Sequence, residues 1–212
     1  GAQPIAPEEE IKRLQPALQI LAREFPEARI SVDTWWSEVA RAAVDMGAHM
    51  INDISGGSLD ERMFSTIADL QVPYVLMHIK GTPETMQNDP RYDDVFREVS
   101  SYFSDRIRFL LDLGVNDIIL DPGFGFGKTD VHNYTLMNHL DDFTIFERPL
   151  LAGVSRKSMV NRILGISAAE ALNGTTVLNT IALQKGASIL RVHDVKEAVE
   201  AVKIVTLTQN LA

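Results

Sequence analysis

The chain has 212 residues, a composition typical of a globular protein, a formal net charge of −9 and no cysteine. The negative charge argues against non-specific nucleic-acid binding, and the absence of cysteine excludes disulfides, a thiolate nucleophile and a cysteine-ligated zinc site. No apolar run approaches the roughly 18 residues of a membrane span, and the start, "GAQPIAPEEE", lacks the features of a signal peptide. We therefore expect a cytoplasmic protein that binds neither nucleic acid nor membranes.

Short apolar runs alternate with longer amphipathic segments along the chain. A helix is predicted over residues 7–24, because Pro7 and the glutamates after it suit a helix N-terminus. Strands are predicted at residues 29–33, 50–53, 73–78, 117–121, 149–153 and 188–192, with helices between them and a last helix over residues 195–207. This alternation predicts a parallel sheet covered by helices, either a closed (β/α)₈ barrel or an open doubly wound sheet.

Polar residues end the predicted strands, and this favours the barrel. In a barrel all the strands end at one face, where the active site is built, whereas an open sheet gathers its ligands at one switch point. We therefore expect an α/β protein with the (β/α)₈ TIM-barrel fold, as a single domain over residues 1–212. Six strands are predicted, and the chain opens on a helix without an initiating methionine. We expect that two N-terminal βα units are missing.

The first two strands end in the motifs "SVDT" and "INDISGG". Asp33 is either a ligand-binding residue or the cap of the next helix. Asn52 and Asp53 place an amide beside a carboxylate, a pair that can bind the donor and acceptor edge of a heterocycle. The alternative is an Asx-turn followed by a glycine hinge.

The third strand leads into "LMHIKGTPETMQ". His78 stands at the strand end, where a lone histidine is more often a hydrogen-bonded structural residue than a catalyst. Met77 is expected to pack, either in the core or against a bound ring.

The stretch "LDPGFGFGKT" follows the fourth strand and resembles a nucleotide-binding loop. A P-loop would need a glycine where Pro122 stands, and a dinucleotide fingerprint would need one where Lys128 stands. Both nucleotide interpretations fail. The three glycines interleaved with Phe124 and Phe126 instead predict a loop that lies against a planar ligand.

The motifs "AGVSRKSM" and "LRVHDV" supply cations. Arg156 and Lys157 precede a predicted helix, where the dipole disfavours positive charge, so they indicate either anion binding or a solvated basic turn. Arg191 and His193 are two residues apart and would share one side of a continued strand. With Lys157 they form a cationic cluster suited to an anionic substrate.

Taken together, these six motifs closely resemble those of the dihydropteroate synthase family, in order and spacing, over nearly all of the chain. The resemblance implies a (β/α)₈-barrel transferase of folate biosynthesis, the class of enzyme that sulfonamides target. Such enzymes join 6-hydroxymethyl-7,8-dihydropterin diphosphate to p-aminobenzoate and release diphosphate. It also implies Mg²⁺ as cofactor, small-molecule substrates and a homodimer.

The resemblance further assigns roles to residues. It implies that Asp33, Asp121 and Lys157 are catalytic. It also implies that the pterin is bound by Asp33, Asn52, Met77, Asp121, Gly153 and Lys157. Arg191 and His193 would hold the diphosphate, while Phe126 and Ser155 would line the p-aminobenzoate side. The family's first strand, with the asparagine linked to diphosphate and Mg²⁺, has no counterpart here, and neither has its second strand with a Ser-Thr-Arg-Pro loop. No residue of this chain is therefore predicted as a metal ligand.

Two alternatives stay open at this point. A methyltetrahydrofolate methyltransferase-like domain of a corrinoid system would share the pterin-binding Asp and Asn pattern. The cations Arg156, Lys157, Arg191 and His193 argue against it, because that substrate carries no diphosphate. The other alternative is a non-catalytic pterin-binding fragment. If these 212 residues are the whole protein, we expect a poorly closed barrel and a weak enzyme.

Overall fold

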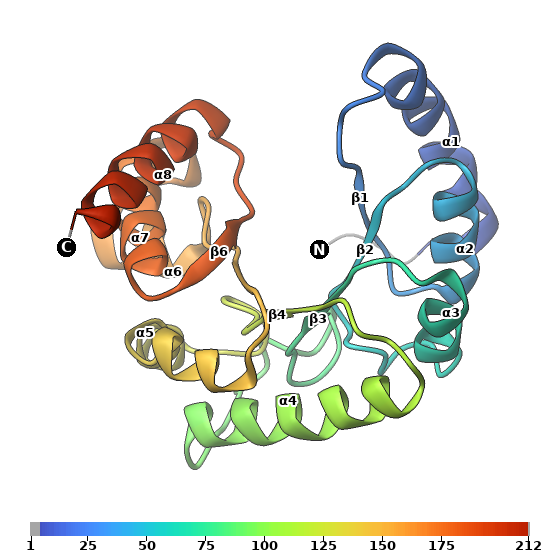
Figure 1. Cartoon of the computed structure of the whole chain (residues 1–212). Helices are drawn as coiled ribbons and strands as arrows, with labels where there is room; N and C mark the ends of the chain where they lie inside the picture. Colours follow the sequence, from blue (N-terminus) through green and yellow to red (C-terminus); the bar gives the residue numbers. More distant parts are fainter. Residues whose placement is uncertain (1–4, 212) are drawn as a thin grey trace. The chain divides into compact units, whose positions relative to one another are not determined.

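The computed structural model describes residues 5–211, which divide into two compact units. Unit 1 comprises residues 5–79 and Phe103–Ile119, and unit 2 comprises Lys80–Tyr102 and residues 120–211. Helices and strands alternate along the chain in both units (Figure 1). Two elements, α4 (Val95–Asp112) and β4 (Ile118–Asp121), contribute residues to both units.

Unit 1 is built on parallel strands with helices along one side (Figure 1). Val32 pairs with Ile51, and Asn52 pairs with Val75, while the amide of Tyr74 donates to the carbonyl of Asp117. These strands are mostly buried, as expected of a parallel sheet covered by helices. The elements are β1 (Ser31–Asp33), β2 (Met50–Asp53), β3 (Tyr74–Met77), α1 (Pro7–Glu24), α2 (Ser37–Asp45) and α3 (Met63–Leu70).

Unit 2 repeats this arrangement around the end of β4. Leu120 pairs with Leu150, and Leu151 pairs with Ile189, with a register irregularity between Leu150 and Leu151. Among residues 5–211, no helix is long and apolar enough to cross a membrane. The remaining elements of this unit are β5 (Leu150–Ala152), β6 (Ala187–Leu190), α5 (Asp130–Asn138), η1 (Leu140–Phe146), α6 (Ser158–Leu164), η2 (Ala168–Glu170), α7 (Leu172–Gln184) and α8 (Val195–Asn210).

All six predicted strands and the first helix are confirmed, although most strands are shorter at their ends than predicted. One expectation is wrong. β6 ends at Leu190, so Arg191 and His193 lie in the loop before α8 and do not share a strand face. The amide of Arg191 still donates to the carbonyl of Ala152, but the chain then turns away to begin α8 at Val195.

The last helix is longer than predicted, and of its apolar positions Val195, Val199, Val202 and Val205, which the sequence pattern indicates as its buried side, only Val205 is buried. The buried residues of α8 are Ala198, Ala201 and Val205. Val199 and Val202 are exposed, as is Val195. Small alanine side chains allow a close approach of α8 to its neighbours, and for this reason the valine periodicity alone does not identify the buried face.

Asp60 fixes the start of α2 within unit 1. Its Oδ2 accepts hydrogen bonds from the Ser37 amide at 2.9 Å and the Ser37 hydroxyl at 2.7 Å, and its Oδ1 accepts from the Arg62 amide at 3.0 Å. Burial opposes the charge, but these hydrogen bonds outweigh it and lower the pKa of Asp60 to about 2. The carboxylate therefore acts as a cap supplied from outside the helix.

Asp60→Asn should lower the free energy of unfolding by about 1–2 kcal/mol at pH 7, the usual cost of losing a helix cap. Because the folded pKa lies below the ordinary value of 3.8, the carboxylate stabilises the fold above pH 4, and this contribution disappears as the pH falls toward 2. Urea unfolding at pH 7 and pH 3 measures both effects. The control is Asp69→Asn, which removes an exposed ion pair with Arg41. A difference from wild type that is equal at both pH values would contradict the prediction.

Candidate active site

Unit 1 brings two of the predicted site residues together at the ends of neighbouring strands. Asp33 and Asn52 are register partners, and the Asn52 Nδ2 donates to Asp33 Oδ1 at 2.8 Å. Asn52 is 4% exposed, and its Oδ1 is buried with no hydrogen-bond partner among the described residues. Buried polar atoms are normally satisfied, so this oxygen is an acceptor available to a ligand donor.

The neighbouring Asp53 has a structural role. Its carboxylate is buried and accepts hydrogen bonds from the amides of Ser55 at 2.7 Å and Gly57 at 2.8 Å, and from the Tyr74 hydroxyl at 2.7 Å. Burial raises the pKa of Asp53 in spite of these hydrogen bonds. Asp53 therefore makes the Asx-turn that was the alternative interpretation of this motif, and of the two residues Asn52 keeps a side-chain acceptor without a partner in the described part of the chain. Met77 and His78, at the end of β3, are also buried.

In unit 2, residues 122–127 form the loop after β4, which we call the glycine loop. Gly127 has a φ of 63°, and a Cβ added to it would lie 2.3 Å from the carbonyl oxygen of Lys80. No other residue fits there without displacing backbone. Phe124 is fully buried and packs in the core, whereas Phe126 is only half-buried. The glycines are therefore needed at least partly for packing, and Phe126 is the aromatic residue of the loop that a ligand can reach.

Lys128 is buried and donates hydrogen bonds to the glycine loop. Its side chain is 1% exposed, and its Nζ donates to the carbonyls of Gly123 and Phe126, both at 3.0 Å. Burial lowers the pKa of Lys128 to about 7, while Asp121 raises it and Lys157 lowers it further. The sequence interpretation considered this lysine only in excluding a dinucleotide-binding fingerprint.

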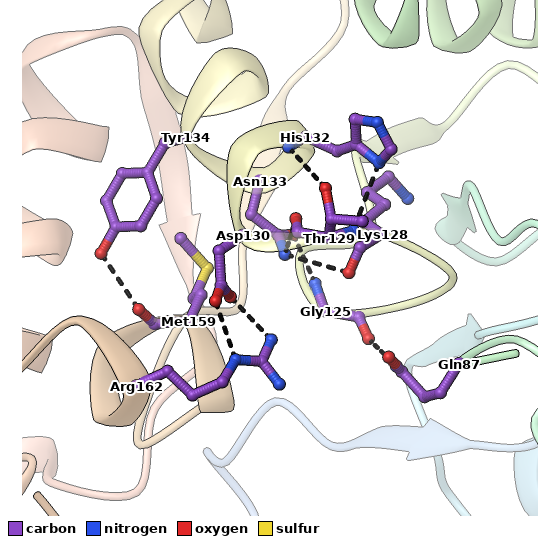
Figure 2. Close-up of polar contacts among 10 residues, drawn as sticks. All are labelled: Gln87, Gly125, Lys128, Thr129, Asp130, His132, Asn133, Tyr134, Met159 and Arg162. Atoms are coloured by element: carbon purple, nitrogen blue, oxygen red, sulfur yellow. Dashed lines mark hydrogen bonds and ion pairs between the residues drawn. The ribbon is translucent and has the colours of Figure 1, made fainter. Parts of the chain in front are cut away.

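Further side chains fix the same loop (Figure 2). Asn133 is fully buried, and its Oδ1 accepts from the amide of Gly125 at 2.7 Å. Gln87 donates to the carbonyl of Gly125 at 2.7 Å, and the hydroxyl of Tyr92 donates to the carbonyl of Gly127 at 2.8 Å. Gln87 and Tyr92 come from a segment distant in the chain, whereas Asn133 lies eight residues after Gly125, in α5. No local signal in the sequence marks these three residues.

Asp121, the last residue of β4, is a buried carboxylate surrounded by cations. One of its oxygens accepts from the amide of Gly123 at 2.8 Å. Burial raises the pKa of Asp121, against the opposing effects of Lys157, the Gly123 amide, Lys128 and Arg191. More positive than negative charge therefore lies around this carboxylate, as an anionic substrate requires.

Lys157 lies against the glycine loop. Its Nζ donates to the carbonyl of Phe124 at 2.6 Å and lies 4.6 Å from the centroid of the Phe126 ring. Burial lowers the pKa of Lys157 to about 8, with Asp121 raising it and Arg191 lowering it. A lysine whose pKa lies so close to neutrality is typical of functional sites.

Arg191, His193 and Ser155 complete the cluster. A Cβ added at Gly153 would lie 3.7 Å from the Lys157 Nζ and 3.8 Å from the Arg191 Cβ, so both cationic residues border this glycine. The Ser155 hydroxyl lies 2.9 Å from Nδ1 of His193 and accepts from the His193 amide at 3.2 Å. Arg191 and His193 are exposed and reachable by an anion.

Arg156 does not belong to this cluster, which corrects the sequence interpretation. Its Nε and Nη2 donate to the two carboxylate oxygens of Asp194 at 2.9 and 2.8 Å, and its Nη1 donates to the carbonyls of Ala168 and Ala169. The guanidinium is thus engaged by a bidentate ion pair and backbone acceptors. It ties the loop before α6 to the loop before α8.

The predicted site residues therefore form two clusters, one in each unit. Asp33 and Asn52 are in contact in unit 1, where Met77 lies at the end of β3. Unit 2 brings together Asp121, Phe126, Gly153, Ser155, Lys157, Arg191 and His193.

Comparisons with known proteins identify the family. Residues 1–193 match the family described as pterin binding enzyme. The chain is 45% identical over 210 residues to the dihydropteroate synthase of Escherichia coli K12, which covers 98% of this chain and 74% of that protein. The chain belongs to the dihydropteroate synthase family. It therefore shares a family with transferases, as the sequence motifs predicted.

Solved dihydropteroate synthases share the fold. The Yersinia pestis enzyme, crystallised with a sulfonamide drug complex, matches with a TM-score of 0.94 at 40% identity, over 98% of this chain and 76% of that one. The Stenotrophomonas maltophilia enzyme, with imidazole bound in its active site, matches with a TM-score of 0.95 at 40% identity, over 99% and 79%. The predicted fold class is confirmed: this chain carries six parallel βα units of a dihydropteroate synthase.

Proposed function

We propose that this chain transfers a pterinylmethyl group from 6-hydroxymethyl-7,8-dihydropterin diphosphate to p-aminobenzoate, as a dihydropteroate synthase. The observation that carries the proposal is the buried Asp121 carboxylate with Lys157, Lys128 and Arg191 around it. Such a site offers acceptors to a heterocycle and cations to a diphosphate. A methyltetrahydrofolate substrate would make no use of the exposed Arg191 and His193.

In the proposed reaction the bond between the pterin methylene carbon and the diphosphate oxygen breaks. The diphosphate leaves with the electron pair, and the amine nitrogen of p-aminobenzoate forms the new carbon–nitrogen bond and then loses a proton. Arg191 and an N–H of His193 would bind the negative charge that grows on the leaving group. Because the electron-rich pterin can delocalise positive charge, departure of diphosphate can run ahead of attack.

The pterin is assigned to Asp33, Asn52, Met77, Asp121, Gly153 and Lys157. The free Oδ1 of Asn52 supports this assignment, because an unpaired buried acceptor matches a ring N–H or an exocyclic amine. The Asp121 carboxylate is a second acceptor, and its charge would stabilise the cationic character that develops on the ring. Lys157 would donate to a pterin acceptor from its place beside Phe124 and Phe126.

The p-aminobenzoate side is assigned to Phe126 and Ser155. The half-buried Phe126 ring supports stacking against an aromatic acid. Ser155 contacts His193, so the two substrate sides share a hydrogen bond in unit 2.

The Mg²⁺, the homodimer and the cytoplasmic location stay predictions. Among residues 5–211, no three histidine, aspartate or glutamate side chains gather into a group that could hold a metal ion. The steps above are assigned only to side chains of this chain.

A turnover assay beside a binding titration tests the proposal. We expect diphosphate release that depends on p-aminobenzoate, and calorimetric binding of the pterin diphosphate. Binding without turnover would favour the non-catalytic alternative. Methyl transfer from methyltetrahydrofolate to a corrinoid, without diphosphate release, would favour the methyltransferase. Repeating the assay over a range of Mg²⁺ concentrations tests the cofactor prediction.

A further inference from the structure

We infer that Lys128 is a positioning residue for Lys157, acting through the glycine loop. The inference deepens the proposed function, because pterin diphosphate binding is one of its two readouts. Lys128 and Lys157 both donate hydrogen bonds to backbone carbonyls of the glycine loop.

The hydrogen bonds of Lys128 bracket the acceptor that Lys157 uses. Lys128 Nζ binds the carbonyls of Gly123 and Phe126, and the carbonyl of Phe124 between them accepts from Lys157 Nζ at 2.6 Å. Phe126 contacts both lysines. Its backbone carbonyl accepts from Lys128 Nζ, and the centroid of its ring lies 4.6 Å from Lys157 Nζ. A shift of this loop would therefore move both groups that fix the ammonium of Lys157.

Lys128 stands next to the start of α5, whose first residues also bind the glycine loop (Figure 2). Lys128 immediately precedes Thr129, whose hydroxyl accepts from the His132 amide in a capping box, and Asn133 in the same helix holds the Gly125 amide. Asn133 also donates to the carbonyl of Thr129 at 2.8 Å. The loop geometry is thus set by a capped helix and two buried side chains.

The start of α5 is joined in turn to α6, the helix that follows Lys157 (Figure 2). Asp130 accepts two hydrogen bonds from Arg162, at 2.8 and 2.6 Å, and the Tyr134 hydroxyl donates to the carbonyl of Met159 at 3.1 Å. Lys128 and Lys157 are therefore attached to helices that are linked to each other, and their side chains converge on one loop.

Packing alone does not explain a lysine at this position. An ammonium that is 1% exposed pays a desolvation penalty that a methionine of similar length would avoid. Its Nζ donates to two loop carbonyls, those of Gly123 and Phe126, and both hydrogen bonds would be lost without it. We therefore attribute the lysine at this position to its hydrogen bonds with the glycine loop.

Hydrogen–deuterium exchange of the ligand-free protein is the first test. Lys128→Met should speed amide exchange over residues 121–127, while α8 exchanges as in wild type. Lys185→Met is the matched control, because Lys185 also donates to a backbone carbonyl, that of Asn138, away from the loop. Unchanged exchange over residues 121–127 in a folded Lys128→Met protein would overturn the inference.

Calorimetric binding of the pterin diphosphate to four proteins is the second test: wild type, Lys128→Met, Lys157→Met and the double variant. We expect about tenfold weaker binding for Lys128→Met and no further loss when it is added to Lys157→Met, since the effects of substitutions within one hydrogen-bond network are not additive. Additive losses would mean that Lys128 acts independently of Lys157. If Lys128→Met does not fold, Lys128→Leu, which likewise cannot donate to the loop, replaces it with the same criteria. A wild-type protein that binds no pterin diphosphate would overturn the proposed function. The exchange test would still decide whether Lys128 fixes the glycine loop.

Discussion

Lys157→Met should lower kcat/KM for the pterin diphosphate by about a hundredfold or more. Methionine keeps much of the side-chain volume but removes the ammonium that lies beside Asp121, Phe124 and Phe126. Lys157 and Asp121 are buried and interact electrostatically, and removing one of two such opposite charges costs about 2–5 kcal/mol. Each 1.36 kcal/mol corresponds to a factor of ten in rate. Steady-state kinetics with both substrates measures the loss.

The pH profile separates this role from a structural one. The pKa of Lys157 is lowered to about 8, so in wild type the ammonium is lost as the pH rises through that value, and kcat/KM should fall with it. Lys157→Met should lack this alkaline limb. Lys185→Met, which removes a more exposed lysine paired with Asp141, should keep both the activity and the limb. An unaltered limb in Lys157→Met would show that another group titrates there.

Arg191→Ala should weaken binding of the pterin diphosphate by about ten- to a hundredfold, since a hydrogen bond to a charged group contributes about 1.5–3 kcal/mol. Binding of bare 6-hydroxymethylpterin should stay within about twofold, because the exposed guanidinium is assigned to the diphosphate alone. Calorimetry with the two ligands gives both numbers. Equal losses for both ligands would mean that Arg191 acts through the structure of the loop.

Arg156→Ala is the matched control for Arg191. Arg156 makes a bidentate ion pair with Asp194 and binds two backbone carbonyls, so its loss should lower stability in urea and leave the ratio of the two affinities unchanged. His193→Ala should resemble Arg191→Ala in discriminating between the ligands. Comparing the two arginine variants therefore distinguishes binding of the diphosphate charge from stabilisation of the loops in unit 2.

The sequence by itself determined the βα order, the six strands and most of the residues at their ends. These features depend on local patterns, since β-branched runs, helix starts and glycine-rich turns are encoded by neighbouring residues. The spacing of six motifs determined the family as well. Even so, the valines of α8 did not reveal its buried face, because only Val205 lies on it, beside Ala198 and Ala201.

Only the tertiary structure distinguished neighbours of similar chemistry. Arg156 and Lys157 are adjacent, yet Arg156 pairs with Asp194, 38 residues away, while Lys157 is buried beside Asp121. Asn52 keeps a free acceptor, whereas all the partners of Asp53 are turn amides and a tyrosine. The physical reason is that burial and hydrogen-bond partners are set by segments far apart in the chain, which local patterns do not record.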